Sequence, residues 1–174
     1  MADKENKGNN YNLESNNYNL DSSNYSFNKK IFKLIEKEAS KSRCLRSKIA
    51  SVIVNKDNLI ISKAVNGNSS KLPPCSKTGC AKDLYRPKVR KGQHNELCTG
   101  ICAEQRAIIN ALIKKVNLND ATLYCNYSPC VSCLRMIIEV GGISKVIYKE
   151  EYNNNTLAKQ IIKLGKIKLI KFVE

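Results

Sequence analysis

Two short segments carry cysteine and glutamate side chains that could bind a metal ion and transfer protons. One is Cys102-Ala103-Glu104, and the other is Pro129-Cys130-Val131-Ser132-Cys133. Zinc binds about four ligands in a tetrahedron, often including thiolate sulfur, and a catalytic site leaves one position open for water. The pattern therefore predicts a catalytic zinc ion held by Cys102, Cys130 and Cys133.

The spacing of these residues suits the two tasks. Cys130 and Cys133 are three residues apart at the predicted start of a helix, so both can bind one ion, and the helix N-terminus stabilises thiolate there. Glu104 lies two residues after Cys102 and points to another side of its helix. It is therefore free to act as a general acid and base beside a water that zinc activates. A closed structural zinc site, the alternative, would need a fourth ligand in place of the open position.

The elements that must position these residues alternate between helix and strand. A helix is expected from Lys29, and a strand at 49–54 pairs through the turn at 56–58 with a second strand from Leu59. The later elements are predicted to be helix 101–116, strand 121–125, helix 130–140, strand 145–148, helix 156–164 and strand 168–172. This order predicts an α/β fold with three α-β-α layers and a five-stranded mixed sheet.

The first 28 residues differ in composition from the rest of the chain. They hold nine Asn and a seven-residue repeat with no helical spacing of apolar residues. Such a segment cannot bury enough apolar surface to order itself, so we expect a disordered Asn-rich tail over 1–28 and one folded domain over 29–174. A docking peptide within this tail is the alternative.

The overall composition indicates which class of protein the chain belongs to. The chain has 174 residues, a net charge of +15 and eight Cys, and it has no apolar run near the roughly 18 residues that a membrane span needs. We expect a soluble, cytoplasmic protein that does not bind membranes, and clustered Cys in a reducing compartment indicates metal binding rather than disulfides. The scattered Lys residues do not by themselves predict a nucleic-acid partner.

Beyond the two metal-binding segments, several further motifs carry a family resemblance. They are Ser42-Arg43-Cys44-Leu45-Arg46, Asn66-Gly67, Pro74-Cys75, Gly79-Cys80 and His94-Asn95-Glu96-Leu97-Cys98. Together they make the chain resemble the cytidine and deoxycytidylate deaminase superfamily, and the deoxycytidylate deaminases most closely. The resemblance implies a cytidine deaminase-like fold and zinc-dependent hydrolytic deamination of dCMP to dUMP and ammonia, a step in pyrimidine deoxynucleotide metabolism. It also implies a homo-oligomer with a small nucleotide substrate and no stable nucleic-acid partner.

The resemblance leaves other functions open. Free-nucleoside cytidine deaminases resemble this chain in having Cys-Ala-Glu, where deoxycytidylate deaminases usually have His-Ala-Glu. Deamination of a base in tRNA or another nucleic acid is a further alternative that the net charge supports slightly. A zinc protein without activity, serving as a binding module, is disfavoured by the presence of Glu104.

The resemblance also implies roles for residues outside the catalytic centre. Members often bind a second, structural zinc, for which the candidate ligands here are Cys44, Cys75, His94 and Cys98, with Cys80 as a substitute. Asn66 matches an Asn that binds the substrate's sugar or base, and a turn residue before Gly67 is its alternative role.

Arg106 stands where deoxycytidylate deaminases usually have Asn. It lies one helical turn after Cys102, so its guanidinium could reach a ligand sulfur and offset the extra thiolate charge. Its alternative role is to face solvent or to pair with a surface acid.

Overall fold

The computed structural model describes residues 22–69, 71–85, 95–152 and 156–174. The chain forms α1 (Ser22–Ala39), β1 (Ala50–Val54), β2 (Ile60–Val65), β3 (Gly67–Asn68), α2 (Cys75–Thr78), α3 (Ala81–Tyr85), a 3-10 turn at Asn95–Leu97, β4 (Gly100–Ile101), α4 (Ala103–Ile113), β5 (Ala121–Tyr127), α5 (Val131–Val140), β6 (Ile143–Glu150), α6 (Thr156–Leu164) and β7 (Lys168–Lys171). The expected order of main elements is confirmed. The short elements inside the Cys-rich segment are additional.

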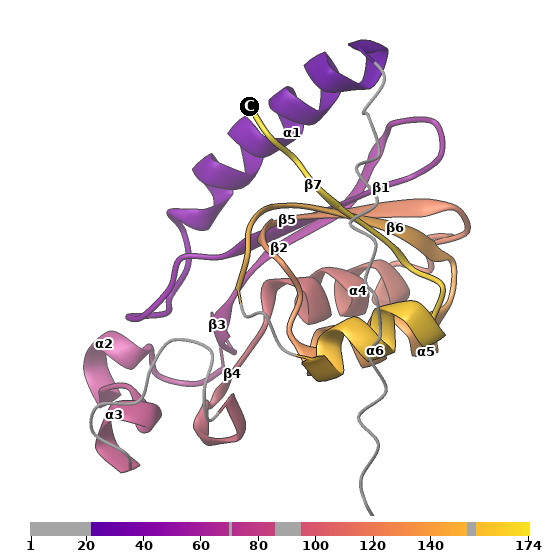
Figure 1. Cartoon of the computed structure of the whole chain (residues 1–174). Helices are drawn as coiled ribbons and strands as arrows, with labels where there is room; N and C mark the ends of the chain where they lie inside the picture. The colour runs from indigo at the N-terminus through magenta and orange to yellow at the C-terminus, as the bar shows by residue number, and fades with distance from the viewer. Residues whose placement is uncertain (1–21, 70, 86–94, 153–155) are drawn as a thin grey trace, which may run out of the picture.

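The main sheet is five-stranded and mixed, as the sequence predicts. Its strand order is β2-β1-β5-β6-β7, with β1 antiparallel to β2 and β5, and with β5, β6 and β7 parallel to one another. Helix α1 covers one face, and α4, α5 and α6 lie on the other (Figure 1). The three-layer α-β-α fold is confirmed.

Alternating side chains of β1 explain why both faces of the sheet are covered. All five residues of this strand are buried. Val52 and Val54 pack with Phe32 of α1, whereas Ile53 packs with Ile108 of α4. Successive side chains of a strand point to opposite faces, so a continuous apolar run demands a helix layer on each side.

Helix α1 begins at Ser22, before the predicted domain boundary between residues 28 and 29. Asn28 is 2% exposed and its Oδ1 accepts a hydrogen bond from the Tyr124 hydroxyl of β5 at 2.7 Å. Phe27 packs edge-on against the same tyrosine. Residues 22–28 of the expected 1–28 tail therefore belong to the first helix, and the other residues of that tail, 1–21, lie outside the described residues.

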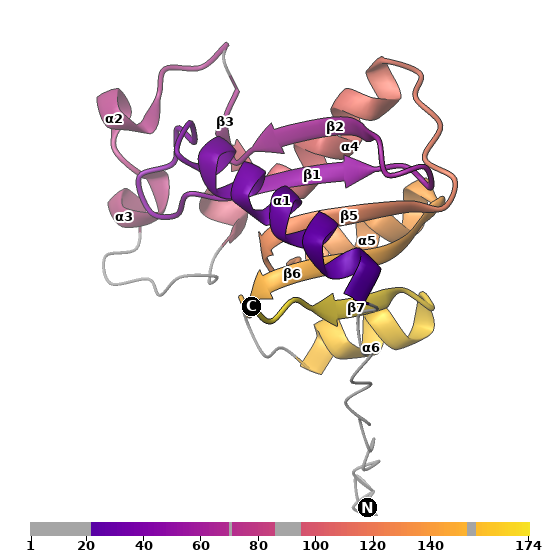
Figure 2. The ribbon, with the colours of Figure 1, turned by 90° about the horizontal axis from the view of Figure 1, so that it is seen from above.

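The short elements gather at one end of the sheet. Strands β5 and β6 point their carboxyl ends toward the side where α2, α3 and β3 lie (Figure 2). In open α/β sheets, ligand sites form at this edge. Among the described residues, no helix has the length and apolar character needed to cross a membrane.

Candidate active site and metal centre

Three cysteine sulfurs meet at the N-termini of α4 and α5. Cys102 and Cys130 precede the two helices as N-cap residues, and Cys133 lies in the first turn of α5. Cys130 Sγ is 3.9 Å from Cys102 Sγ and 3.4 Å from Cys133 Sγ, and all three sulfurs lie within 4.8 Å of one another. Two thiolates bound to one tetrahedral zinc at about 2.3 Å are about 3.8 Å apart, so the cluster fits this ion.

Hydrogen bonding within the cluster favours a thiolate. The thiols of Cys102 and Cys133, together with backbone N–H groups of α5, lower the pKa of Cys130 to about 3. The pKa of Cys102 is raised, chiefly by its hydrogen bond to Cys130. A group that already holds one thiolate at a helix N-terminus is suited to exchange its remaining thiol protons for a metal cation.

Glu104 lies in the first turn of α4 and is 5% exposed. Burial raises the pKa of its carboxyl to about 7, and the nearby Cys130 adds to this rise. A carboxyl with a pKa near the working pH can both accept and donate a proton, as a general acid–base group must. The Glu104 carboxyl also forms a side-chain hydrogen bond with the Cys133 thiol, so it lies beside the sulfur cluster as a fourth functional group.

A two-stranded ribbon joins the loop after β2 to the start of α4. Gly67 pairs with Ile101, and Asn68 pairs with Gly100, so Asn66 and Cys102 flank the same ribbon. A Cβ added to Gly100 would lie 2.6 Å from the carbonyl carbon of Gly67. Only glycine permits this approach, which brings the predicted substrate residue and the first predicted zinc ligand to one site.

The side chain of Asn66 is held by the segment that leads into β1. Its Oδ1 accepts hydrogen bonds from Ser42 Oγ at 2.5 Å and from Ile49 N at 3.0 Å, and its Nδ2 donates to Ser47 O at 3.0 Å. Asn66 also lines a pocket that includes Cys102. Its expected role in substrate binding stays a prediction, whereas its role in fixing residues 42–49 is visible.

Arg106 contacts the ribbon. Its Nη2 donates to the carbonyl oxygens of Gly67 and Asn68, the latter at 3.2 Å. Burial, and to a lesser extent Arg43, lower the pKa of its guanidinium. Among the described residues, no hydrogen bond from Arg106 reaches a sulfur of the cluster. Instead of the predicted contact with a ligand sulfur, Arg106 makes hydrogen bonds to the backbone of β3, the strand after Asn66.

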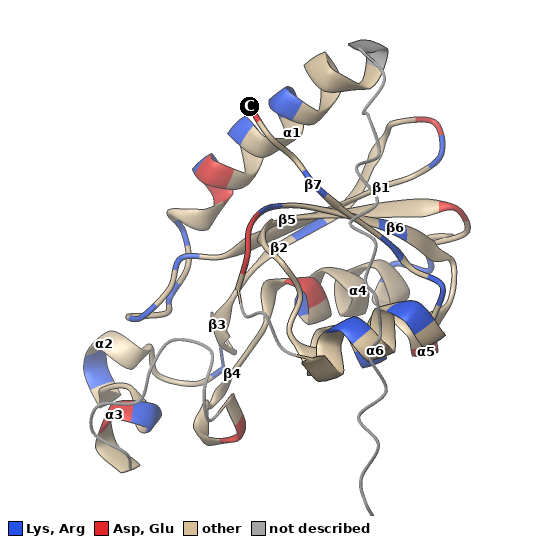
Figure 3. Ribbon diagram, in the orientation of Figure 1, with Lys and Arg blue, Asp and Glu red and all other residues tan. Residues whose placement is uncertain are grey.

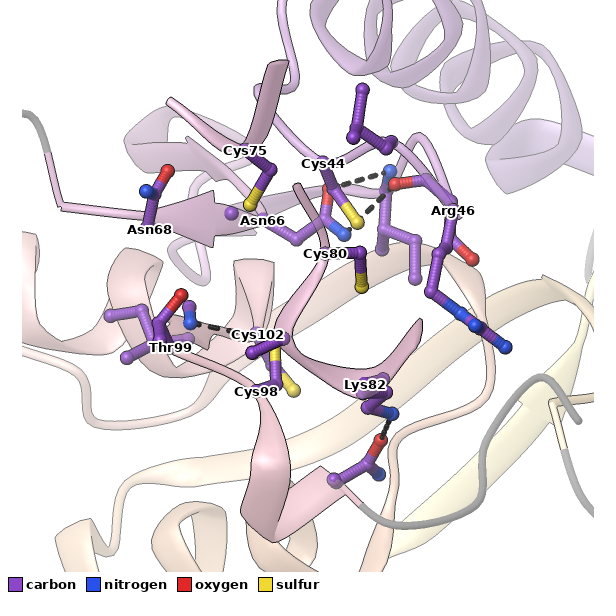
Figure 4. Close-up of a pocket in the computed structure, with 18 of the residues that line it drawn as sticks. Cys44, Arg46, Asn66, Asn68, Cys75, Cys80, Lys82, Cys98, Thr99 and Cys102 are labelled. Atoms are coloured by element: carbon purple, nitrogen blue, oxygen red, sulfur yellow. Dashed lines mark hydrogen bonds between the residues drawn. The ribbon is translucent and has the colours of Figure 1, made fainter. Parts of the chain in front are cut away.

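The second group of cysteines lines one pocket next to Cys102 (Figure 4). Cys75 is 8% exposed, and the pKa of its thiol is raised by burial and by the neighbouring Cys44, Cys80 and Cys98. Three of the four predicted ligands and the substitute Cys80 thus line one pocket, but among the described residues only Cys102, Cys130 and Cys133 have ligand atoms close enough to share one ion. The remaining candidate, His94, lies outside the described residues.

Comparison with known proteins agrees with this geometry. Residues 25–150 match the family model for the cytidine and deoxycytidylate deaminase zinc-binding region. The chain belongs to this deaminase family. Since the model describes a zinc-binding region and the three sulfurs have the spacing of zinc ligands, the family assignment and the cluster support each other.

Relatives within the family include deoxycytidylate deaminases. The protein of that name from Saccharomyces cerevisiae is 32% identical over 142 residues, which are 80% of this chain and 43% of the yeast protein. A Caenorhabditis elegans protein, named a probable deoxycytidylate deaminase, is 33% identical over 124 residues, covering 68% of this chain and 56% of its own length. This chain thus spans about half or less of these relatives.

A solved structure supports the fold. The dCMP deaminase of cyanophage S-TIM5, crystallised with dCMP and dUMP, superposes with a TM-score of 0.66 at 24% identity. The match covers 84% of this chain and 97% of the phage protein. The cytidine deaminase-like fold expected from the sequence is confirmed.

Some pocket residues of this family member were not anticipated from the sequence. They are Lys82, Asn95 and Tyr152, and all three line the pocket beside Cys102. Lys82 and Asn95 lie in the long Cys-rich segment, whose conformation has no periodic pattern to predict it. Tyr152 follows β6 by two residues, and its position at a strand's carboxyl end was the one available indication.

Proposed function

We propose that this chain hydrolytically deaminates dCMP to dUMP and ammonia. The observation that carries the proposal is the cluster of Cys102, Cys130 and Cys133 with the buried Glu104 beside it. Membership of the deaminase family supports it, as do relatives that are named deoxycytidylate deaminases. In this role the enzyme supplies dUMP to pyrimidine deoxynucleotide metabolism.

The chemistry divides between metal and carboxylate. Zinc, when bound by Cys102, Cys130 and Cys133, supplies Lewis acidity that makes a water ligand easier to deprotonate. Glu104 accepts a proton from the attacking water and delivers it to N3 of cytosine. Once the new C4–O bond has formed, Glu104 takes the remaining proton of that hydroxyl and passes it to N4, so that the C4–N4 bond breaks, ammonia leaves and C4 becomes a carbonyl.

Deamination of free cytidine or deoxycytidine is the second candidate function. Cys102 favours it, because a Cys-Ala-Glu segment resembles that of nucleoside deaminases. Ammonia release from dCMP, CMP, deoxycytidine and an RNA hairpin, measured side by side with zinc-loaded protein, tests both. We expect dCMP to be preferred. A preference for deoxycytidine or RNA would replace the proposal.

A second, structural zinc forms part of the same proposal. Cys44, Cys75 and Cys98 supply three ligands, and the fourth is Cys80 or His94. The lining of one pocket by these cysteines supports this grouping, because thiolates gathered from several segments are typical ligands of zinc. The Cys-rich segment has little apolar content, so metal binding would stabilise its fold.

The assembly and cellular location complete the proposal. We infer a cytoplasmic homo-oligomer without a stable nucleic-acid partner. On α4, Ile109, Leu112 and Ile113 are 38%, 51% and 74% exposed, and such an apolar stripe supports burial against a second copy. Lys and Arg are spread over many elements (Figure 3), which argues against a dedicated nucleic-acid surface. Light scattering of the purified protein tests the oligomer.

A further inference from the structure

One edge of the molecule, far from the sulfur cluster in sequence, is strongly basic. The segment 156–171 runs from the start of α6 to the end of β7, and it contains no Asp or Glu. Its basic residues are Lys159, Lys163, Lys166, Lys168 and Lys171. We name the surface formed by residues 156–171 the α6–β7 edge. Its positive charge favours an acidic binding partner.

Strand β7 lies at the end of the main sheet. Among the described residues it pairs with β6 alone, so its other side presents backbone groups that no neighbouring strand satisfies. Apolar side chains are exposed nearby: Leu157 and Leu164 of α6 are 43% and 82% exposed, and Val173, two residues after β7, is 71% exposed. An edge with these features is suited to bind an extended segment.

The N-terminal part of the chain begins beside this edge. Helix α1 starts at Ser22, and the ring of Tyr25 lies 5.5 Å from the ring of Phe172, the residue directly after β7 (Figure 2). Residues 1–21, which lie outside the described residues, directly precede this helix. Seven extended residues span about 23 Å and the four residues of β7 about 13 Å, so one seven-residue repeat of this segment is long enough to run along β7.

The sequence of residues 1–21 is complementary to the α6–β7 edge. It has four acidic residues and two lysines, although the whole chain has a net charge of +15. Each repeat places Tyr and Leu two residues apart with an acid directly after the Leu, as in Tyr11-Asn12-Leu13-Glu14 and Tyr18-Asn19-Leu20-Asp21. This alternation is typical of a strand. Lysines on an edge strand oppose pairing with a basic strand, whereas opposite charges favour pairing with an acidic one.

We propose that residues 9–21 dock along the α6–β7 edge of their own chain as an added strand beside β7. Their backbone pairs with the free side of β7, Glu14 and Asp21 lie against the lysines, and the Tyr and Leu side chains cover the exposed leucines of α6. The docked segment prevents a second copy from pairing with the same edge. Exposed ion pairs contribute little to folding stability, so this cover barely changes the melting temperature.

Carbodiimide cross-linking of carboxylates to lysines in the zinc-loaded full chain, followed by mass spectrometry, locates the segment. We expect Glu14 and Asp21 to cross-link to lysines of the α6–β7 edge in preference to Lys56. That residue is an exposed lysine in the turn between β1 and β2, beside the other half of the sheet. Mixing chains of two isotopic compositions separates contacts within a chain from contacts between copies. The cross-links should lie within one chain.

Hydrogen exchange of the outward backbone amides of β7 measures how well the edge is covered. The full chain with Glu14→Gln and Asp21→Asn should exchange these amides about two- to fivefold faster than wild type, since each exposed ion pair contributes little. Asp3→Asn with Glu5→Gln removes the same charge outside the repeats and should leave the exchange unchanged. High salt should speed the exchange in wild type and have little effect on the first variant.

Three results would overturn the proposal. They are tail cross-links spread evenly over the lysines of the chain, cross-links that join different copies only, and unchanged β7 exchange when Glu14 and Asp21 are neutralised. The proposed deamination does not depend on this cover, so ammonia release from dCMP should be the same in both variants and in wild type.

Discussion

Cys102 and Glu104 are two residues apart, and we propose different tasks for them because α4 begins between them. Cys102, as the N-cap residue, has extended backbone and presents its sulfur to the cluster. Glu104 is already helical, and its buried carboxyl stays near the sulfurs with a pKa of about 7. The Cys-x-Glu spacing thus follows from the geometry of a helix start.

Arg106 is expected to act through the ribbon. Arg106→Gln should lower the free energy of unfolding by about 1.5–3 kcal/mol, since it removes charged hydrogen bonds to the carbonyls of Gly67 and Asn68. It should also raise the KM for dCMP, because Asn66, the predicted substrate-binding residue, directly precedes the strand β3 that Arg106 contacts. Denaturant unfolding and steady-state kinetics measure both effects, and Arg135→Gln on the exposed side of α5 is the control.

A double variant distinguishes these hydrogen bonds to β3 from charge compensation at the sulfurs. Adding Cys102→His to Arg106→Gln supplies a neutral metal ligand. It supplies no hydrogen-bond donor for the carbonyls of Gly67 and Asn68, so activity should not recover. Clear recovery in the double variant would mean that Arg106 offsets the charge of the metal centre.

At the scale of elements, α1 shows where sequence reasoning fell short. The start of this helix could not be predicted from its Asn-rich composition, because Asn and Ser have low helix propensity and contribute no apolar periodicity. The helix extends back to Ser22 through tertiary contacts: Tyr25 lies against Phe172, with ring centroids 5.5 Å apart, and Phe27 lies against Tyr124. Contacts with residues far away in the sequence therefore outweigh the low helix propensity of these first residues.

Truncation at the two boundaries measures the contribution of these contacts. Removing residues 1–21 should leave the melting temperature and activity nearly unchanged. Removing residues 1–27 also deletes Tyr25 and Phe27, which should cost roughly 1–3 kcal/mol from lost aromatic burial. Thermal unfolding of the two truncated forms and of the full chain compares their stability. Equal stability of the two truncated forms would show that the first turns of α1 contribute nothing.

Glu38 ties the end of α1 to β2. Its Oε1 accepts hydrogen bonds from Lys63 Nζ at 2.8 Å and from Lys41 Nζ at 2.9 Å, and these lysines lower the pKa of its carboxyl. A lowered carboxyl pKa means that the pair stabilises the fold above the unfolded pKa near 4.5, and that this stability is lost as the pH falls through the folded pKa.

The pH dependence of a Glu38→Gln variant checks this link. At pH 7 the variant should be less stable than wild type by on the order of 0.5–1 kcal/mol, because partly exposed ion pairs contribute little more. At a lower pH the difference should shrink, since the stability from the pair is lost as the pH falls through the lowered folded pKa of Glu38. Urea unfolding at the two pH values gives the comparison. A difference that is independent of pH would assign the effect to packing.

For the whole molecule, the sequence predicts the layers of the fold and the meeting of three cysteines well. Val52, Ile53 and Val54 form a continuous apolar run that requires helices on both faces, and the Cys102, Cys130 and Cys133 pattern is tied to helix starts. The Cys-rich segment was less predictable. Its short elements are ordered by contacts such as that of Lys82 with Asn95, which no local periodicity encodes.

Metal content tests how the Cys-rich segment is held. Wild type should carry about two zinc ions per chain, one per ligand set. Cys75→Ser should lower this by about one and destabilise the fold, because structural zinc binding is coupled to folding. Cys125→Ser, in the buried centre of β5, is the control: it should cost stability without losing metal. A wild-type content of one zinc, unchanged by Cys75→Ser, would exclude the second site.

The most direct test of the central claim is the rate of dUMP formation from dCMP by zinc-loaded wild type and Glu104→Gln. Both proteins should fold and hold equal zinc, because Glu104 is not needed to complete the sulfur cluster. Wild type should produce dUMP and ammonia in equal amounts, and the variant should be slower by on the order of 10²–10⁴-fold, as expected for loss of a general acid–base group. No dUMP from the wild-type enzyme, or similar rates from both proteins, would contradict the account.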